Sequence, residues 1–118
     1  MKYALLLYAN EADQPDYMAP EGAAEMAQWG AFTQELAESG SLLGGEALQE
    51  VATATNVRIR EGSTITADGP FAETKEALGG FYLIDVADLD AAIAWAEKIP
   101  NVGYGTVEIR PIMTFEEG

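Results

Sequence analysis

The sequence predicts an α+β domain in which an antiparallel sheet carries two helices on one face. Two segments, "KYALLLY" at 2–8 and "GGFYLIDV" at 79–86, are apolar at both alternating sets of positions, which is typical of strands buried on both sides. Two other segments repeat apolar residues at three- and four-residue spacing, as amphipathic helices do. The chain therefore reads strand, helix, strand, hairpin, strand, helix, strand, which reduces to a split βαββαβ arrangement.

The length of the chain predicts one domain. Its 118 residues match the usual size of roughly 100–150 residues, so we expect a single domain over 1–118. A hydrophobic content of 48% is that of a globular protein, and no apolar run approaches the roughly 20 residues of a membrane span. Cysteine is absent and nothing in the chain indicates export, so a cytoplasmic location is expected.

Pro20 and Gly40 bound the first predicted helix. Proline suits the first helical position because its φ is preset and its missing N–H would be unpaired there, and glycine commonly follows the last turn. A helix over about 20–38 is therefore expected. Its apolar residues form a stripe that should pack on the sheet: Met26, Trp29, Phe32 and Leu36.

A short strand and a hairpin are predicted in the middle of the chain. Gly44 and Gly45 interrupt the strand segment "SLLGGEAL", which indicates a bulge or a close approach to the backbone. The segments "TATNVRIREG" and "STITAD" alternate polar and apolar residues on either side of a turn at "EGS", so they should pair as a hairpin.

Asp88 and Pro100 bound the second predicted helix, the first as its N-cap and the second because proline cannot continue it. The buried stripe is expected to comprise Leu89, Ala92, Ile93, Ala96 and Ile99. A last strand, "TVEIRPIM", follows. Pro111 cannot donate to a ladder, so this strand should lie at an edge or be bulged there.

Two helices cover only one face of such a sheet, whereas the strands that start near 2 and 79 are apolar on both faces. The second face must therefore be covered by something outside the monomer. We expect a homodimer that packs sheet against sheet and encloses a cavity between sheet, helices and loops.

Charge and composition exclude several classes of function. A formal charge of −14 repels phosphate, so neither nucleic acid nor an anionic membrane is an expected partner. Histidine and cysteine are absent, and the carboxylates follow no metal-binding spacing, so no metal site is predicted. Phosphate-loop and dinucleotide motifs are also missing, and no cofactor is predicted. Catalysis would have to use carboxylates, tyrosines, lysine or a borrowed cofactor.

At "DGPFAETKEALGGFYLIDV", residues 68–86, the sequence resembles the YCII-related family, and within it the branch named for the DGPF motif. The segments "MKYALLLY", "GGEAL", "VRIREG" and "VEIRPI" extend the resemblance over nearly the whole chain. The resemblance implies a ferredoxin-like domain that dimerises into an α+β barrel. It implies no particular activity, although the family's genes are often found beside extracytoplasmic-function sigma factors.

A histidine–aspartate pair is the proposed active site of the more distant YciI-like branch. This chain departs from that branch because it has no histidine. An imidazole-based mechanism is therefore excluded here.

The loop that begins at Asp68 holds the predicted catalytic residues. Asp68 is the candidate general acid or base, because burial beside Phe71 would raise its pKa toward the useful range. Lys75 is the candidate that orients Asp68 or Glu73, or that contacts an anionic ligand. Asp-Gly-Pro is equally typical of a plain turn, and the residues around Lys75 of a solvated charged loop, so both interpretations stay open.

Four residues are candidate substrate contacts. Arg58 shares a strand face with Arg60. Because this acidic protein has few cations and places several of them near one loop, we expect a small carboxylate-bearing or aromatic ligand there. Tyr8 ends the first strand, Tyr82 lies on a central one, and Phe71 belongs to the loop. Each of these aromatic residues could instead fill the core or an interface, and the arginines could merely offset neighbouring acids.

These features support a homodimeric small-molecule enzyme, or enzyme-like protein, of unassigned substrate. A regulatory module linked to sigma-factor signalling, which binds a ligand in the same pocket without converting it, is the alternative. A third interpretation is structural, with the loop locking the dimer.

Overall fold

The computed structural model describes residues 1–69 and 75–115. Within these residues the chain forms two α-helices, six strands and two short 3₁₀ turns. The elements are β1 (Lys2–Ala9), η1 (Glu11–Asp13), α1 (Pro20–Glu38), β2 (Leu42–Ala47), η2 (Val51–Thr53), β3 (Thr55–Arg60), β4 (Ser63–Asp68), β5 (Ala77–Asp85), α2 (Leu89–Ala96) and β6 (Thr106–Pro111).

Four strands form one antiparallel sheet in the order β2-β5-β1-β6. The apolar strands β1 and β5 lie at its centre, and Leu5 pairs with Tyr82 and Ile109 across them. β6 is an edge strand, which explains how Pro111 is accommodated. This strand order with helices between β1 and β2 and between β5 and β6 confirms the ferredoxin-like α+β fold.

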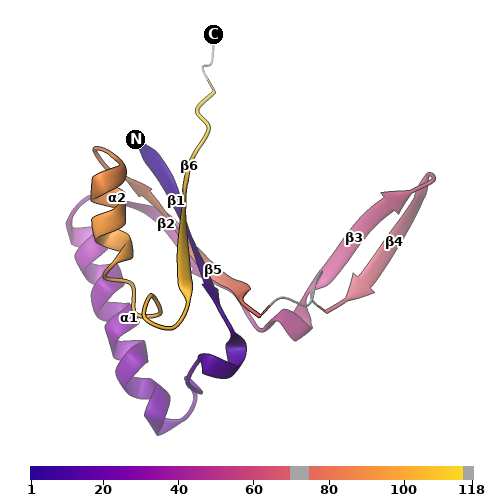
Figure 1. Cartoon of the computed structure of the whole chain (residues 1–118), viewed down its shortest axis with the longest axis horizontal. Coiled ribbons are helices and arrows are strands. Elements are labelled where there is room, and N and C mark those ends of the chain that lie inside the picture. Colours follow the sequence, from indigo (N-terminus) through magenta and orange to yellow (C-terminus); the bar gives the residue numbers. More distant parts are fainter. Residues whose placement is uncertain (70–74, 116–118) are drawn as a thin grey trace.

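Both helices lie on the same face of the sheet (Figure 1). Alternate residues of β1 point toward them, and Tyr3, Leu5 and Leu7 are buried there. Phe32 and Leu36 of α1 complete the core from the helix side. Asp88 accepts a hydrogen bond from the backbone N–H of Ala91, so the predicted N-cap of α2 is confirmed.

Three residues predicted in the helix stripes are not buried. Met26 is 49% exposed, Leu89 50% and Ile93 39%. Periodicity identifies the side of a helix that faces the sheet but not the length over which the sheet covers it. Met26 lies in the N-terminal half of α1, where it lines an open cavity and does not pack in the core. Leu89 similarly begins α2, where the core has ended.

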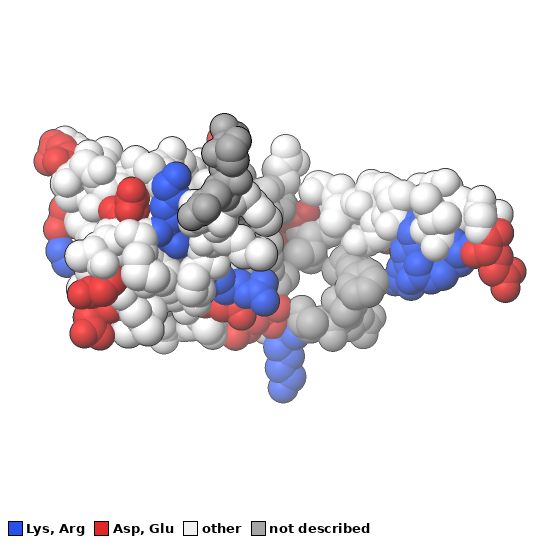
Figure 2. Space-filling view, turned by 90° about the horizontal axis from the view of Figure 1, so that it is seen from above, with Lys and Arg blue, Asp and Glu red and all other residues white. Residues whose placement is uncertain are grey.

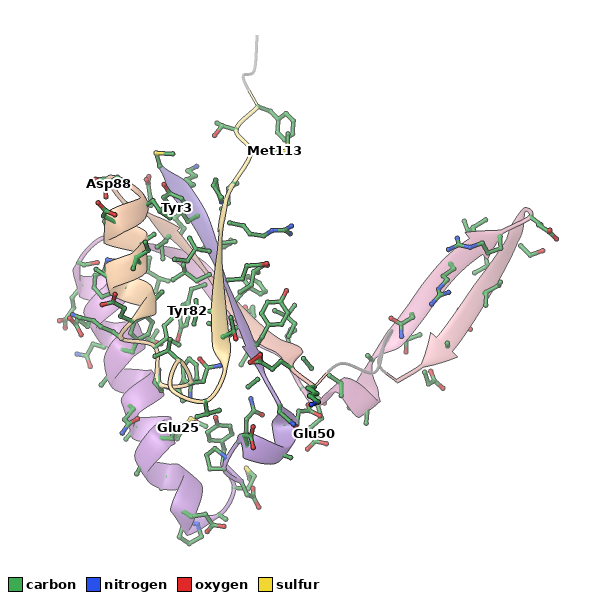
Figure 3. All side chains as sticks on the ribbon, viewed as in Figure 1. Tyr3, Glu25, Glu50, Tyr82, Asp88 and Met113 are labelled. Atoms are coloured by element: carbon green, nitrogen blue, oxygen red, sulfur yellow. The ribbon has the colours of Figure 1, made fainter. Side chains whose placement is uncertain are left out.

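β3 and β4 pair only with each other and form a hairpin that projects from the body of the molecule (Figure 1). Its turn uses Glu61 and Gly62 at positive φ, as a two-residue hairpin turn requires. Val57 and Ile59 are 62% and 65% exposed, and Figure 3 shows the hairpin side chains standing away from the other strands. An isolated two-stranded hairpin is at best marginally stable in water.

The sheet face opposite the helices is covered by neither α1 nor α2 (Figure 1). Leu6 pairs with Phe81, and Ala4 with Leu83, so apolar residues occupy the centre of this face. Glu108 and Arg110 flank them on β6. The uncovered face expected from the sequence is therefore present.

Candidate functional site

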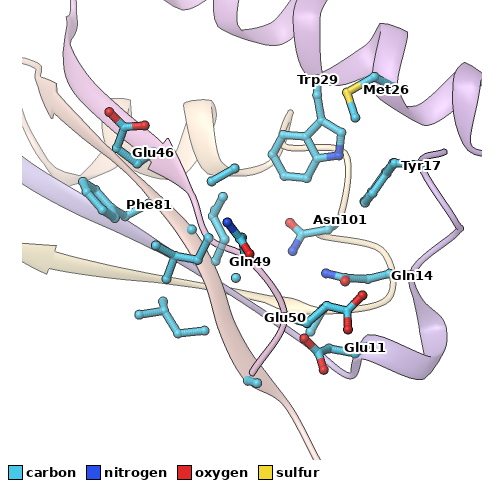
Figure 4. Close-up of a pocket in the computed structure, with 18 of the residues that line it drawn as sticks. Glu11, Gln14, Tyr17, Met26, Trp29, Glu46, Gln49, Glu50, Phe81 and Asn101 are labelled. Atoms are coloured by element: carbon cyan, nitrogen blue, oxygen red, sulfur yellow. The ribbon is translucent and has the colours of Figure 1, made fainter. Parts of the chain in front are cut away.

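A cavity of about 1160 Å³ opens beside the N-terminal half of α1. Its walls come mainly from the segment 14–18 with α1, the segment that runs from β2 into η2, and β5 (Figure 4). Residues of β1 and η1 and Asn101 of the loop before β6 complete them. Trp29, Met26, Leu48 and Phe81 provide apolar surface. The size is sufficient for a small molecule, since ligand cavities usually measure about 300–1,000 Å³.

The carboxylate of Glu25 holds two residues of this wall in place. Its Oε2 accepts hydrogen bonds from the hydroxyl of Tyr17 and from Nε1 of Trp29, the latter at 3.2 Å. The hydroxyl of Tyr104 donates to both carboxylate oxygens, at 2.9 and 3.0 Å. One carboxylate therefore ties together the segment before α1, the helix itself and the loop before β6.

Both phenols in this cluster resist ionisation. Burial raises the pKa of Tyr104 well above its ordinary value of 10.0, and hydrogen bonds with Tyr17 and Glu25 act in the same direction. Burial also raises the pKa of Tyr17, followed by its hydrogen bond to Glu25. Each hydroxyl thus keeps its proton and continues to donate to Glu25.

Asn101 places a buried polar group in the same cavity. The residue is 3% exposed, and its Oδ1 has no hydrogen-bond partner among the described residues. Its backbone carbonyl is occupied, because it accepts from the N–H of Gly105 at 2.7 Å and of Tyr104 at 3.2 Å. Figure 4 shows its side chain pointing into the space between Trp29 and Gln14. The cavity therefore contains an unsatisfied hydrogen-bond acceptor.

Acidic side chains surround the cavity. Glu11, Asp16, Glu46 and Glu50 contribute to its wall, and none of the described lining residues is a lysine or an arginine. Glu11 also accepts a hydrogen bond from the backbone N–H of Val51 at 3.0 Å, which joins η1 to η2. The wall combines apolar surface, hydrogen-bond acceptors and negative charge.

The predicted substrate contacts lie in different places. Tyr82 lines the cavity, where its hydroxyl is 2.7 Å from Oγ1 of Thr33. Tyr8 alternates with Leu7 and Ala9 on β1, so it faces the opposite side of the sheet. Arg58 lies on the exposed hairpin. Figure 2 shows basic side chains gathered on one side of that hairpin and acidic ones at its tip.

The predicted catalytic loop is described only at its ends. Asp68 is exposed at the end of β4, where it pairs with Thr55, and Lys75 is exposed before β5. Asp68 and Lys75, both of which the structure describes, do not form an ion pair with each other. Phe71 and Glu73 lie outside the described residues, so their predicted roles stay predictions. The loop nevertheless starts and ends near the cavity. The N–H of Gly69 donates to the carbonyl oxygen of Ala54 at 2.7 Å, next to Thr53 in the wall, and Ala77 also lines the wall.

Sequence reasoning missed Glu25, Tyr17, Tyr104 and Asn101. Glu25 does not belong to the apolar stripe of its helix. No local spacing joins it to Tyr104, which lies 79 residues away. One feature of the sequence could have indicated this cluster. Tyr17 lies eight residues before Glu25, just ahead of the helix that also carries Trp29.

The chain belongs to the YCII-related family. The sequence model of the YCII-related domain matches residues 1–116. The chain is also 38% identical over 120 residues to "Uncharacterized protein R00369" of Rhizobium meliloti (strain 1021), an alignment that covers 100% of this chain and 97% of that protein. The expected family is thereby confirmed.

Two further observations bear on the classes of function considered. Residues 1–69 and 75–115 contain no group of three or more potential ligands among His, Cys, Asp and Glu that could hold a metal ion. No helix in these ranges has both the length and the apolar character needed to cross a membrane.

Proposed function

We propose that the protein is a homodimeric small-molecule enzyme, or enzyme-like protein, whose ligand occupies the cavity beside α1. The observation that supports this most directly is the composition of the wall, where apolar surface from Trp29 and Met26 meets the buried acceptor of Asn101 (Figure 4). Ligand sites usually combine apolar walls with a few fixed polar groups. The cluster around Glu25 holds the wall rigid before a ligand arrives.

The DGPF loop supplies the proton-transfer group in this proposal. Gly69 is hydrogen-bonded to Ala54, the neighbour of Thr53 in the cavity wall, and Ala77 also belongs to that wall, so both ends of the loop lie close to the rim. Asp68 is the general acid or base there, oriented by Lys75 or Glu73. Arg58, Phe71, Tyr8 and Tyr82 are the proposed substrate contacts, and we place the chain in the DGPF branch of its family on the same motif.

A second copy of the chain covers the open sheet face in this proposal and gives the α+β barrel assembly. The apolar pairs around Leu6 and the projecting hairpin support it, because both leave apolar side chains in water within one monomer. When two copies pack through their open sheet faces, the apolar side chains around Leu6 and those of the hairpin can both be buried.

Substitution of Leu6 by glutamate is expected to convert a dimer into a monomer of 12.6 kDa. The new charge would lie on the packed sheet face, where it cannot be solvated. Sedimentation velocity at about 10 μM protein measures the mass. Ile93→Glu is the matched control, because Ile93 is 39% exposed on the helix layer, and it should remain a dimer. A wild-type protein that sediments as a monomer contradicts the proposal.

Asp68→Asn tests the catalytic role, because it keeps the size of the side chain and removes its titration. A thermal-shift screen of small aromatic and carboxylic compounds, run on wild type and variant together, should identify a ligand for the wild type. Conversion of that ligand should fall by roughly 10²–10⁴-fold in the variant, the usual contribution of a general acid or base. Asp90→Asn, at the exposed start of α2, should leave it unchanged.

A regulatory binding module without catalysis is the second candidate. It is favoured by the position of Asp68, which is not among the residues that line the cavity. This function predicts a ligand that stabilises wild type and Asp68→Asn equally and is recovered unchanged. If no compound stabilises either protein, both functions are contradicted.

A further inference from the structure

We propose that the cavity selects an amine on an aromatic or apolar body, with an ammonium N–H donated to Oδ1 of Asn101. This inference rests on the proposed function only in that a small molecule binds in the cavity. It specifies the polar group of that ligand, for which the sequence had suggested a carboxylate.

The first argument is the unpaired acceptor. Asn101 is 3% exposed and its Oδ1 has no partner among the described residues, although nearly all buried polar atoms in proteins have one. Oδ1 can only accept a hydrogen bond. The group that completes it must therefore carry an N–H or an O–H, which a carboxylate at neutral pH does not.

The second argument is that two hydrogen-bond donors of the wall are already engaged by Glu25. The hydroxyl of Tyr17 and the indole N–H of Trp29 donate to Glu25, and neither is left for an anionic ligand. The raised pKa of Tyr17 keeps that arrangement intact. Gln14 and Gln49 carry amides that both donate and accept, so they fit either kind of ligand.

The third argument is charge. Glu11, Asp16 and Glu50 lie in the wall without a lysine or arginine among the described lining residues, in a chain of net charge −14. A concave site lined by one sign of charge attracts ligands of the opposite sign. The same site repels a carboxylate. Acidic residues alone would not define a site, but here they surround the buried acceptor of Asn101.

The fourth argument concerns the body of the ligand. Trp29 and Met26 present apolar surface on the side of the cavity that holds Asn101 (Figure 4). Aromatic rings attract cations over their faces, and tryptophan does so most strongly. An arylalkylamine satisfies the apolar surface and the acceptor together.

The test compares ligands matched in shape and opposite in charge. Phenethylamine and tryptamine are the amine probes, and 3-phenylpropionate and indole-3-propionate are their acid counterparts. Binding to the full chain at pH 7 is measured by isothermal titration calorimetry and by thermal shift. The amines are expected to bind at least about tenfold more tightly than the acids, a factor that corresponds to about 1.4 kcal/mol.

Asn101→Leu removes the acceptor and keeps a side chain of similar size. It should weaken the amines by about tenfold or more and leave the weak binding of the acids unchanged. Glu50→Gln changes an exposed residue of the wall, and should weaken the amines several-fold while strengthening the acids. This second variant keeps the test decisive if Asn101→Leu does not fold.

Three results would overturn the inference. These are acids that bind as tightly as the amines, amines that bind Asn101→Leu as tightly as wild type, and no binding by either amine. In the last case the library screen separates the two proposals. A different compound that stabilises the protein leaves the small-molecule function standing and refutes only the amine, whereas a screen without any hit refutes both.

Discussion

Replacement of Gly105 by alanine is expected to lower the melting temperature by about 4–12 °C. A Cβ at this position would fall on the backbone carbonyl oxygen of Tyr8 and lie 3.1 Å from Cβ of Ala9. Backbone atoms of a central strand cannot move aside without breaking the ladder, so the loop must shift instead. Overpacking of this kind costs about 1–3 kcal/mol.

Gly103→Ala is the control from the same loop, since a Cβ there meets nothing within 4 Å. Its melting temperature should stay within about 2 °C of wild type or rise, because alanine restricts the unfolded chain. The loop also carries Asn101 and Tyr104, so Gly105→Ala should weaken ligand binding in the cavity and Gly103→Ala should not. Equal melting temperatures for the two variants would show that the loop adjusts freely.

Gly22→Ala is expected to destabilise the protein by about 1–3 kcal/mol, although alanine is normally the better helix former. Gly22 is buried in the first turn of α1, and a Cβ there would fall on the carbonyl oxygen of Asp16 and lie 2.7 Å from Cα of Tyr17. The segment that carries Tyr17 would be displaced from Glu25. Thermal unfolding measures the loss, and tryptophan fluorescence should change because Trp29 shares that carboxylate.

Gly30→Ala provides the matched control on the same helix. Gly30 is exposed, and a Cβ there meets nothing within 4 Å. This variant should be more stable than wild type by about 1 kcal/mol, in line with helix propensity. Opposite signs for the two substitutions are the expected result. If both variants were stabilised, the close packing of residues 16–17 against α1 would be refuted.

The elements of the fold could be predicted because their causes are local. Pro20 and Gly40 bound α1 through backbone geometry alone, and Asp88 caps α2 through a hydrogen bond to a residue three positions away. The pairing of β3 with β4 follows from a turn that accepts positive φ at Glu61 and Gly62. The extent of burial was less predictable, as Met26 and Leu89 show, because it depends on where neighbouring elements end.

The candidate site was harder to predict for a related reason. The sequence directed attention to the DGPF loop because its residues are contiguous and chemically varied. The structure brings together Tyr17, Glu25 and Tyr104, whose side chains meet only after α1 and the loop before β6 have packed on the sheet. Among the predicted site residues that the structure describes, Tyr82 alone lines the cavity.

The order of the elements, the two central strands, the helix boundaries and the membership of the YCII-related family could be read from the amino-acid sequence. These features depend on neighbouring residues and on periodicity. The folded chain was needed to show that Glu25 accepts from three donors, and that Oδ1 of Asn101 is buried beside a cavity without a partner among the described residues. Hydrogen bonding and burial involve side chains from distant segments, and the spacing of residues along the chain does not encode which of them meet.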